Sequence, residues 1–94
     1  MKVLIAYDVC TADSPGSRRL RRVARACQDY GQRVQKSIFE CVVGPAEWVQ
    51  LRSRLLEEID QTQDSLRCYF LSADVQVEHH GAAKPVDFEE ALVV

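Results

Sequence analysis

The sequence predicts a single α+β domain with the ferredoxin-like element order β-α-β-β-α-β. An apolar run rich in branched residues at positions 2–9 is typical of a central strand. Two segments with apolar residues at helical spacing follow, at about positions 14–30 and from position 45 onward. Strand-like segments at positions 33–43 and 66–71 come after each of these. A chain of 94 residues is long enough for one such domain with a modest core.

Capping residues predict where the first helix begins and ends. Asp13 or Ser14 can cap its start, and Pro15 is tolerated in the first helical turn. We expect the helix to end at Tyr30, with Gly31 in the left-handed conformation that often closes a helix.

The first helix has an apolar stripe and a basic face. The stripe follows the spacing i, i+3, i+4, i+7 of a buried helix side and consists of Leu20, Val23, Ala24 and Cys27. Arg19 flanks it, and the opposite side carries Arg18, Arg21, Arg22 and Arg25. Like charges one turn apart weaken a helix, so a face of one sign indicates a polyanionic partner. Arginine forks bind phosphate oxygens, which favours duplex DNA or a structured strand held by its backbone.

The charge is divided unevenly along the chain. Positions 1–36 carry eight Lys and Arg against three Asp, whereas positions 37–94 carry four against eleven acidic residues. The net charge of −2 therefore hides a basic first third at +5 and a remainder at −7. This asymmetry also favours a nucleic-acid partner for the first helix.

Segment lengths and boundary residues predict the remaining strands and the second helix. The length of segment 33–43 and its polar centre at 35–37 predict two short antiparallel strands or one bent strand. Gly44-Pro45 begins the second helix, whose apolar stripe consists of Trp48, Leu51, Leu55 and Ile59. Positions 61–64 form a loop before the last strand.

The first strand is apolar on both of its faces. Val3, Ile5 and Tyr7 alternate with Leu4 and Ala6. In this fold both helices cover one face of the sheet, and a wet second face would show polar residues. Because no third helix is available, we expect a second copy of the chain to cover that face, in a two-fold, sheet-to-sheet homodimer.

The tail at positions 72–94 contains further strand-like segments. Positions 75–78 alternate, 81–84 form a turn, and 86–88 and 91–94 read as edge-strand segments. An apolar edge strand left in solvent is a liability. The additional C-terminal strand therefore joins its own sheet or is exchanged onto the partner protomer, and we favour exchange.

Asp8 ends the first strand in register with Leu4 and Ala6. If that face forms the dimer interface, Asp8 meets its own copy across the two-fold axis. Two close carboxylates repel unless a cation lies between them, and Mg²⁺ accepts one or two carboxylates while keeping its waters. Asp8 is thus a candidate metal ligand and catalytic residue, with a turn cap or a hydrated pair as the alternatives.

Other acidic and histidine residues give weaker evidence for catalysis. Two-metal phosphodiester hydrolysis needs several converging carboxylates, and the candidates are Asp13 in a loop and Glu40 on a strand. His79 and His80 are adjacent on the tail, so their side chains point to opposite sides of a strand. We interpret them as surface residues, with metal ligands or general bases as the alternative. A small-molecule-sensing domain on the same fold remains a third hypothesis.

The cysteines and the hydropathy exclude several classes of protein. The four cysteines form no C-x-x-C pair and lie in apolar segments: Cys10, Cys27, Cys41 and Cys68. They are interpreted as small buried residues of a reducing cytoplasm, and a zinc site is not expected. No run is long enough to span a membrane, and no signal-peptide pattern follows Met1-Lys2, so we expect a cytoplasmic protein without a membrane partner.

Three segments form a distinctive pattern over about the first three quarters of the chain. They are the strand end Tyr7-Asp8-Val9, the arginine-rich helix at 18–31, and the run Tyr30-Gly31-Gln32-Arg33-Val34-Gln35-Lys36-Ser37-Ile38-Phe39-Glu40. With them the sequence resembles the family of CRISPR-associated protein 2.

The resemblance implies a ferredoxin-like homodimer of the spacer-acquisition machinery. Such a dimer bridges two dimers of CRISPR-associated protein 1, the integrase, and helps to hold captured duplex DNA. The alternative function is a Mg²⁺-dependent endonuclease that cleaves single-stranded RNA or double-stranded DNA. The first function can proceed without Asp8, whereas the second requires it.

The resemblance also implies roles for individual residues. Asp8 matches the aspartate that binds a metal shared between two protomers. The arginines of the family match Arg19 or Arg22 on the helix and Arg33 on the following strand. Ser37 and Phe39 match residues beside the metal, and Tyr7 belongs to the same supporting group. The expected nucleic-acid-binding set is Arg18, Arg19, Arg21, Arg22, Arg25 and Arg33.

Overall fold

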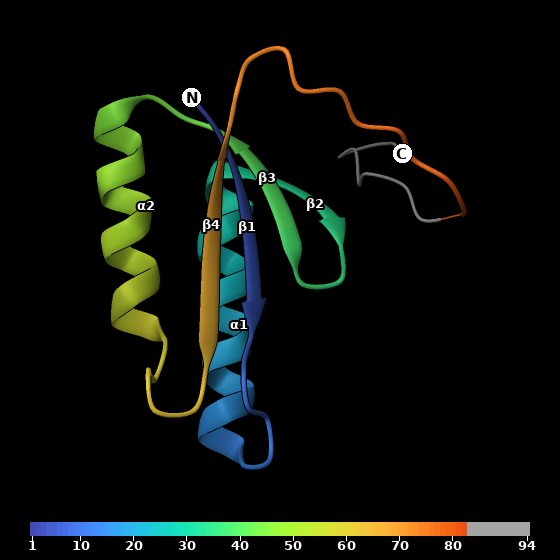
Figure 1. Ribbon diagram of the computed structural model, residues 1–94. Coiled ribbons are helices and arrows are strands. Elements are labelled where there is room, and N and C mark those ends of the chain that lie inside the picture. The colour runs from blue at the N-terminus through green and yellow to red at the C-terminus, as the bar shows by residue number, and fades with distance from the viewer. Residues whose placement is uncertain (83–94) are drawn as a thin grey trace.

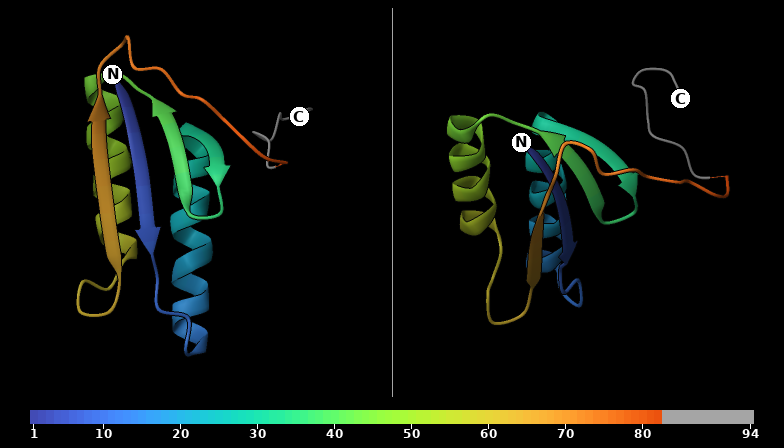
Figure 2. Two further views of the ribbon diagram at one scale, coloured as in Figure 1. Left: turned by 45° about the vertical axis from the view of Figure 1, so that its right-hand side comes forward. Right: turned by 45° about the horizontal axis from the view of Figure 1, so that its top comes forward.

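A computed structural model describes residues 1–82 of the chain and confirms the predicted order of elements (Figure 1). The elements are β1 (Lys2–Asp8), α1 (Ser14–Tyr30), β2 (Gly31–Gln35), β3 (Ile38–Val42), α2 (Pro45–Glu58) and β4 (Ser65–Leu71). The four strands form one antiparallel sheet in the order β2-β3-β1-β4. Both helices lie on the same side of that sheet, so the fold is α+β, and no helix among residues 1–82 covers the other face, called the uncovered face below (Figure 2).

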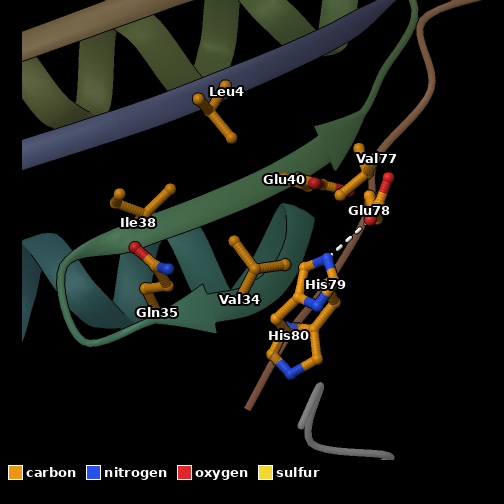
Figure 3. A pocket seen from close by; sticks show the side chains of 9 residues that line it. All are labelled: Leu4, Val34, Gln35, Ile38, Glu40, Val77, Glu78, His79 and His80. Carbon is orange, nitrogen blue, oxygen red and sulfur yellow. Dashed lines mark hydrogen bonds and ion pairs between the residues drawn. The ribbon is translucent and has the colours of Figure 1, made fainter. Parts of the chain in front are cut away.

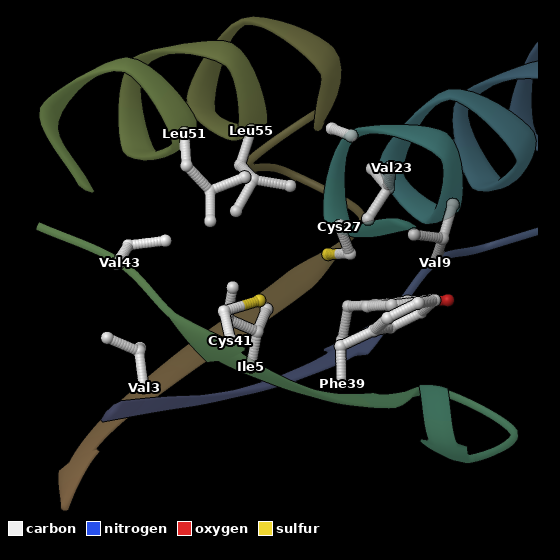
Figure 4. Packing of buried hydrophobic residues seen from close by; sticks show 12 residues of the cluster. Val3, Ile5, Val9, Val23, Cys27, Phe39, Cys41, Val43, Leu51 and Leu55 are labelled. Atoms are coloured by element: carbon white, nitrogen blue, oxygen red, sulfur yellow. The ribbon is translucent and has the colours of Figure 1, made fainter. Parts of the chain in front are cut away.

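The core lies between the sheet and the two helices (Figure 4). Its buried members are Val3, Ile5, Tyr7, Val9, Val23, Ala26, Cys27, Phe39, Cys41, Val43, Leu51 and Leu55. Phe39 is the largest side chain that is fully buried. Burial raises the pKa of the Cys27 thiol to about 12 and that of Cys41 to about 11, so both behave as apolar packing groups. The interpretation of these two cysteines as buried, unpaired residues is confirmed.

The predicted start of α1 is confirmed, and the residues that form it keep the preceding loop close to the helix. The Asp13 side chain accepts a hydrogen bond from the Gly16 backbone N–H at 2.9 Å, and Pro15 occupies the first turn. The loop folds back so closely that a Cβ atom at Gly16 would collide with the Cys10 carbonyl. Glycine is therefore required at this point, and the segment that follows Asp8 packs directly on α1.

The predicted left-handed conformation of Gly31 is wrong. Its φ of −159° is extended, and Gly31 is already the first residue of β2, opposite Cys41 of β3. A Cβ atom at Gly31 would collide with the Glu40 carbonyl oxygen and the Cys41 sulfur. The glycine thus permits close approach of two strands instead of a helix-ending turn, because the chain passes from α1 into β2 without a loop.

The segment after α1 forms two short antiparallel strands and not one bent strand, which confirms the first of the two alternatives. β2 and β3 are joined by a tight turn at Lys36-Ser37, and their register shifts between Arg33 and Gln35. Such an irregularity is a β-bulge, which bends a strand and increases its twist. Val34 and Gln35, at this bulge, both line a groove on the uncovered face that is described below.

The tail differs from its prediction over residues 75–78, which form no strand within the protomer. After β4 the chain leaves the sheet edge and crosses toward β2, but residues 75–78 pair with no strand among the described residues (Figures 1 and 2). The prediction that residues 75–78 add a strand to the protomer's own sheet is therefore wrong. The strand-like segments at 86–88 and 91–94, and the end of the turn at 81–84, lie outside the described residues. Within residues 1–82, no helix is long and apolar enough to span a membrane.

Candidate functional site

The uncovered face of the sheet carries the predicted Asp8 site. In β1 the side chains of Val3, Ile5 and Tyr7 are buried under the helices, whereas Leu4 and Ala6 are only half-buried. Asp8 is exposed, and the alternation of the strand places it on the same face as Leu4 and Ala6, as expected.

The neighbouring strand β4 adds two residues to this face that sequence analysis missed. Ser65 pairs with Asp8 and Arg67 pairs with Ala6, so both lie on the face of the sheet that carries the Asp8 carboxylate. The Arg67 Nη1 donates a hydrogen bond to the Tyr69 hydroxyl at 3.2 Å. The alternating polar residues of β4 were the available signal, but only the pairing with β1 shows that they share a face with Asp8.

Asp8 belongs to no cluster of metal-binding side chains among the described residues. Residues 1–82 contain no group of three or more His, Cys, Asp or Glu side chains arranged to hold a metal ion. Asp13 is occupied as the cap of α1, and Glu40 pairs with Leu4, well along the strand from Asp8. One exposed carboxylate fits Mg²⁺, which keeps most of its waters, but it supplies only part of the donors of a two-metal site.

Three of the expected site residues form a stack on the opposite, helix-covered side of the strand end. The ring of Tyr7 stacks on that of Phe39 with centroids 6.2 Å apart. The guanidinium carbon of Arg33 lies 4.9 Å from the Phe39 centroid, and its Nη1 donates to the Lys36 carbonyl at 2.7 Å. These side chains therefore pack against the end of β1 on the helix-covered side of the sheet and do not line the face that carries Asp8.

The hydroxyl of Tyr7 is buried and has no hydrogen-bond partner within the described residues. Burial raises the pKa of this phenol, since the charged form would lose its hydration. Tyr7 is therefore neutral at physiological pH and acts here through its ring.

Ser37 approaches the site through its backbone. Its carbonyl accepts a hydrogen bond from the Tyr7 N–H at 3.1 Å. This bond attaches the β2–β3 turn to the end of β1, directly before Asp8. Ser37 therefore lies near Asp8, as predicted, and the contact is made by its main chain and not by its hydroxyl.

Arg19 is held inside the protein by Asp64. Its Nε and Nη2 donate to the two carboxylate oxygens of Asp64 at 2.9 and 3.3 Å. The Arg19 side chain is 16% exposed and that of Asp64 is 0% exposed. The hydrogen bond from Arg19 is the main cause that lowers the pKa of Asp64, which stays ionised. Asp64 stood in a predicted loop, and its sequence context contained no signal for this pair.

The other arginines of α1 remain at the surface. Arg22 lies 3.9 Å from Glu58, and Arg25 lies 3.3 Å from Asp29, in pairs that water screens. Arg18 and Arg21 are exposed and pair with no carboxylate among residues 1–82. The basic face predicted from the sequence is therefore present, without Arg19.

A groove of about 560 Å³ lies between the tail and the uncovered face of β2 and β3 (Figure 3). It is lined by Leu4, Val34, Gln35, Ile38, Glu40, Val77, Glu78, His79 and His80. His80 Nε2 is 2.6 Å from a Glu78 carboxylate oxygen, and His79 Nε2 is 3.1 Å from the Gly81 carbonyl. Both histidines are exposed, as predicted, and their contacts are with the tail and not with Asp8.

Comparison with known proteins gives consistent matches. The profile of the family described as "CRISPR associated protein Cas2" matches residues 1–78. A Chlorobaculum tepidum protein named "CRISPR-associated endoribonuclease Cas2" is 57% identical over 100% of both chains. A Halalkalibacterium halodurans protein named "CRISPR-associated endonuclease Cas2" is 48% identical over 99% of each chain. The crystal structure of Streptococcus pyogenes Cas2 at pH 6.5 has a TM-score of 0.78 and 52% identity, covering 86% of this chain and 100% of that one.

Proposed function

The chain belongs to the CRISPR associated protein Cas2 family, and from this premise we propose that it is a DNA-holding subunit of spacer acquisition. In this proposal two copies form a sheet-to-sheet homodimer in the cytoplasm. The dimer bridges two dimers of the integrase, CRISPR-associated protein 1, and holds captured duplex DNA.

The observation that carries this proposal is the basic face of α1. Arg18, Arg21, Arg22 and Arg25 are exposed on one side of the helix, and the first two have no acidic partner among the described residues. A face of one sign weakens its own helix, so a polyanion is the partner that would compensate it. Contacts of this kind bind phosphates without reading sequence, which suits an adaptor that accepts many different DNA fragments.

The uncovered face of the sheet supports the homodimer. Leu4, Ala6 and Ile38 lie there, and so do Val42, which is 74% exposed, and Tyr69, which is 43% exposed. Glu40 and Arg67 lie on the same face, but exposed apolar side chains grouped in this way are typical of an interaction surface. A second copy would bury it and would bring two Asp8 carboxylates toward the two-fold axis, where Mg²⁺ would offset their repulsion.

The salt dependence of duplex binding tests the basic face. Replacing Arg18 or Arg21 with Gln should reduce the slope of log K against log salt by roughly one for each phosphate that a protomer no longer neutralises. Arg52→Gln, on the exposed surface of α2, is the matched control and should leave the slope unchanged. Equal slopes for all three variants and the unmodified protein would reject the α1 face as the DNA contact.

A metal-dependent endonuclease is the second candidate function. It is favoured by the exposed position of Asp8 on the uncovered face and by the nuclease names of the similar proteins. A bound Mg²⁺ would neutralise charge on a phosphodiester and lower the pKa of a bound water. The chain's own contribution is the Asp8 carboxylate that holds the ion, with Arg67 nearby on the same face.

Asp8→Asn separates the two functions. It should abolish Mg²⁺-dependent cleavage of single-stranded RNA or duplex DNA if the protein is a nuclease, whereas Asp74→Asn, an exposed tail control, should not. Spacer acquisition with the partner integrase is measured in parallel. Acquisition that persists in Asp8→Asn supports the architectural role, and acquisition lost together with cleavage would contradict it.

A further inference from the structure

A buried carboxylate joins three segments of the chain at the Asp8 end of the sheet. The Asp64 side chain accepts hydrogen bonds from the Cys10 N–H at 3.0 Å and from the Asp60 N–H at 2.8 Å. It also accepts two bonds from the guanidinium of Arg19, at 2.9 and 3.3 Å. All of its acceptor positions are directed at the β1–α1 loop, at helix α1 or at the α2–β4 loop.

These contacts lie on both sides of Asp8. Cys10 follows Asp8 by two residues along the chain. Asp64 directly precedes Ser65, which is the strand partner of Asp8 in β4. The position of the Asp8 carboxylate therefore depends on two backbone segments that a single side chain holds together.

We propose that Arg19 and Asp64 are a positioning pair for Asp8, and that Arg19 acts through Asp64 and not as a phosphate contact. The inference rests on the proposed metal site at Asp8. A charge with 0% exposure needs a partner, and the planar fork of arginine makes two parallel bonds that lysine cannot make. Because its Nε and Nη2 both bind Asp64 and its side chain is only 16% exposed, Arg19 has little accessible surface for contact with a nucleic acid.

A second ion pair on α1 provides a matched control. Asp29 pairs with Arg54 of α2 at 2.9 Å, and both side chains are more than a third exposed. Asp29 lies ten residues after Arg19, about 15 Å along the helix axis and away from the Asp8 end of the sheet. Asp29→Asn thus removes a bond between two elements without touching the segments around Asp8.

Amide hydrogen exchange of the full chain, followed by NMR, tests the positioning directly. Asp64→Asn keeps the shape of the side chain but places an amide nitrogen among four N–H donors that come from three residues. The Cys10 and Asp60 amides should then exchange about tenfold faster or more, as expected for loss of a hydrogen bond to a charged group. Arg19→Lys, a milder variant, should accelerate the same amides, and Asp29→Asn should not.

Mn²⁺ as a paramagnetic probe tests the consequence for the metal site. With Asp8→Asn as the blank, Asp64→Asn should weaken Asp8-dependent Mn²⁺ binding by about tenfold, a typical effect of removing a group that supports a metal ligand. Asp29→Asn should bind Mn²⁺ like the unmodified chain. Equal Mn²⁺ affinity and equal Cys10 exchange in Asp64→Asn and Asp29→Asn would overturn the inference.

Duplex binding distinguishes the role of Arg19 from that of its neighbours. Arg19→Gln should leave the salt slope unchanged, whereas Arg18→Gln should reduce it by roughly one. An equal reduction for Arg19→Gln would overturn the inference, because Arg19 would then contact phosphate. If the unmodified chain shows no Asp8-dependent Mn²⁺ binding, the proposed metal site fails, and the exchange rates of Cys10 and Asp60 still decide whether the pair holds the strand end.

Discussion

The two faces of β1 carry similar residues in different surroundings. Val3 and Ile5 are fully buried against the helices, whereas Leu4 and Ala6, which alternate with them, are half-buried on the uncovered face. One face is complete within the protomer and stabilises the fold. The other face carries Leu4 and Ala6 together with polar residues such as Glu40 and Arg67, and it is the face on which we propose that a second copy packs.

The end of the strand shows the same difference between adjacent residues. Tyr7 is 6% exposed and stacks on Phe39, and Asp8 is exposed on the opposite face. A shift of one residue in register would bury the carboxylate and expose the ring. The apolar face therefore fixes the register, and the register presents Asp8.

Loss of a side chain from the covered face should have the largest effect. Phe39→Ala should lower the free energy of unfolding by about 3–5 kcal/mol, because it removes a fully buried ring and leaves a cavity. Ile38→Ala, one residue earlier on the uncovered face, should cost less in dilute solution. Urea denaturation at low protein concentration measures both, and equal losses would contradict the asymmetry of the two faces.

A charge on the uncovered face should prevent self-association without unfolding the protomer. Leu4→Asp should raise the dissociation constant of the homodimer by at least about 100-fold, since an unpaired charge would be buried in the interface. Val49→Asp, on an exposed position of α2, is the control. Analytical ultracentrifugation gives both constants. A dimer of unchanged affinity in Leu4→Asp would show that another surface associates.

Acid should weaken the end of the sheet that presents Asp8. The hydrogen bond from Arg19 lowers the pKa of Asp64, and the hydrogen bonds from Thr62 and Gln63 lower that of Asp60 to about 2. A depressed folded-state pKa contributes stability that is present above the unfolded value of about 3.9 and is lost as pH falls toward the folded value.

The free energy of unfolding should therefore decrease from about pH 4 toward pH 2, and less steeply in Asp64→Asn than in the unmodified chain. Denaturation curves over this range measure the two slopes. Identical slopes would mean that Asp64 has the same pKa in the folded and unfolded states. This is the smallest of the expected effects, since Asp64 is one of several carboxylates that titrate there.

Much of the fold was predictable because its signals are local. Branched apolar residues predicted β1, and the spacing of Leu20, Val23 and Cys27 predicted the buried side of α1. Alternation along β1 correctly predicted the face on which Asp8 lies. Gly31 was misinterpreted, because its conformation depends on the close approach of β3 and not on the end of the helix.

The site was less predictable than the fold. Helical spacing placed Arg19 beside the apolar stripe, but only the packing of α1 against the α2–β4 loop brings it to Asp64, 45 residues away. Arg67 likewise joins the face of Asp8 only through the pairing of β1 with β4. Residues 75–78 alternate like a strand but pair with no strand among residues 1–82, because alternation alone does not supply the backbone hydrogen bonds of a neighbouring strand.

Local patterns along the chain were enough to establish the order of the elements, the two apolar faces of β1 and the single sign of charge on α1. Periodicity and charge act over a few residues, so they can be read directly from the amino-acid order. Packing of the sheet and helices, in contrast, selects which arginine is engaged internally, which residues share a face with Asp8 and how two loops hold the end of its strand. Those outcomes depend on contacts between segments far apart in the chain, which arise only when the elements come together.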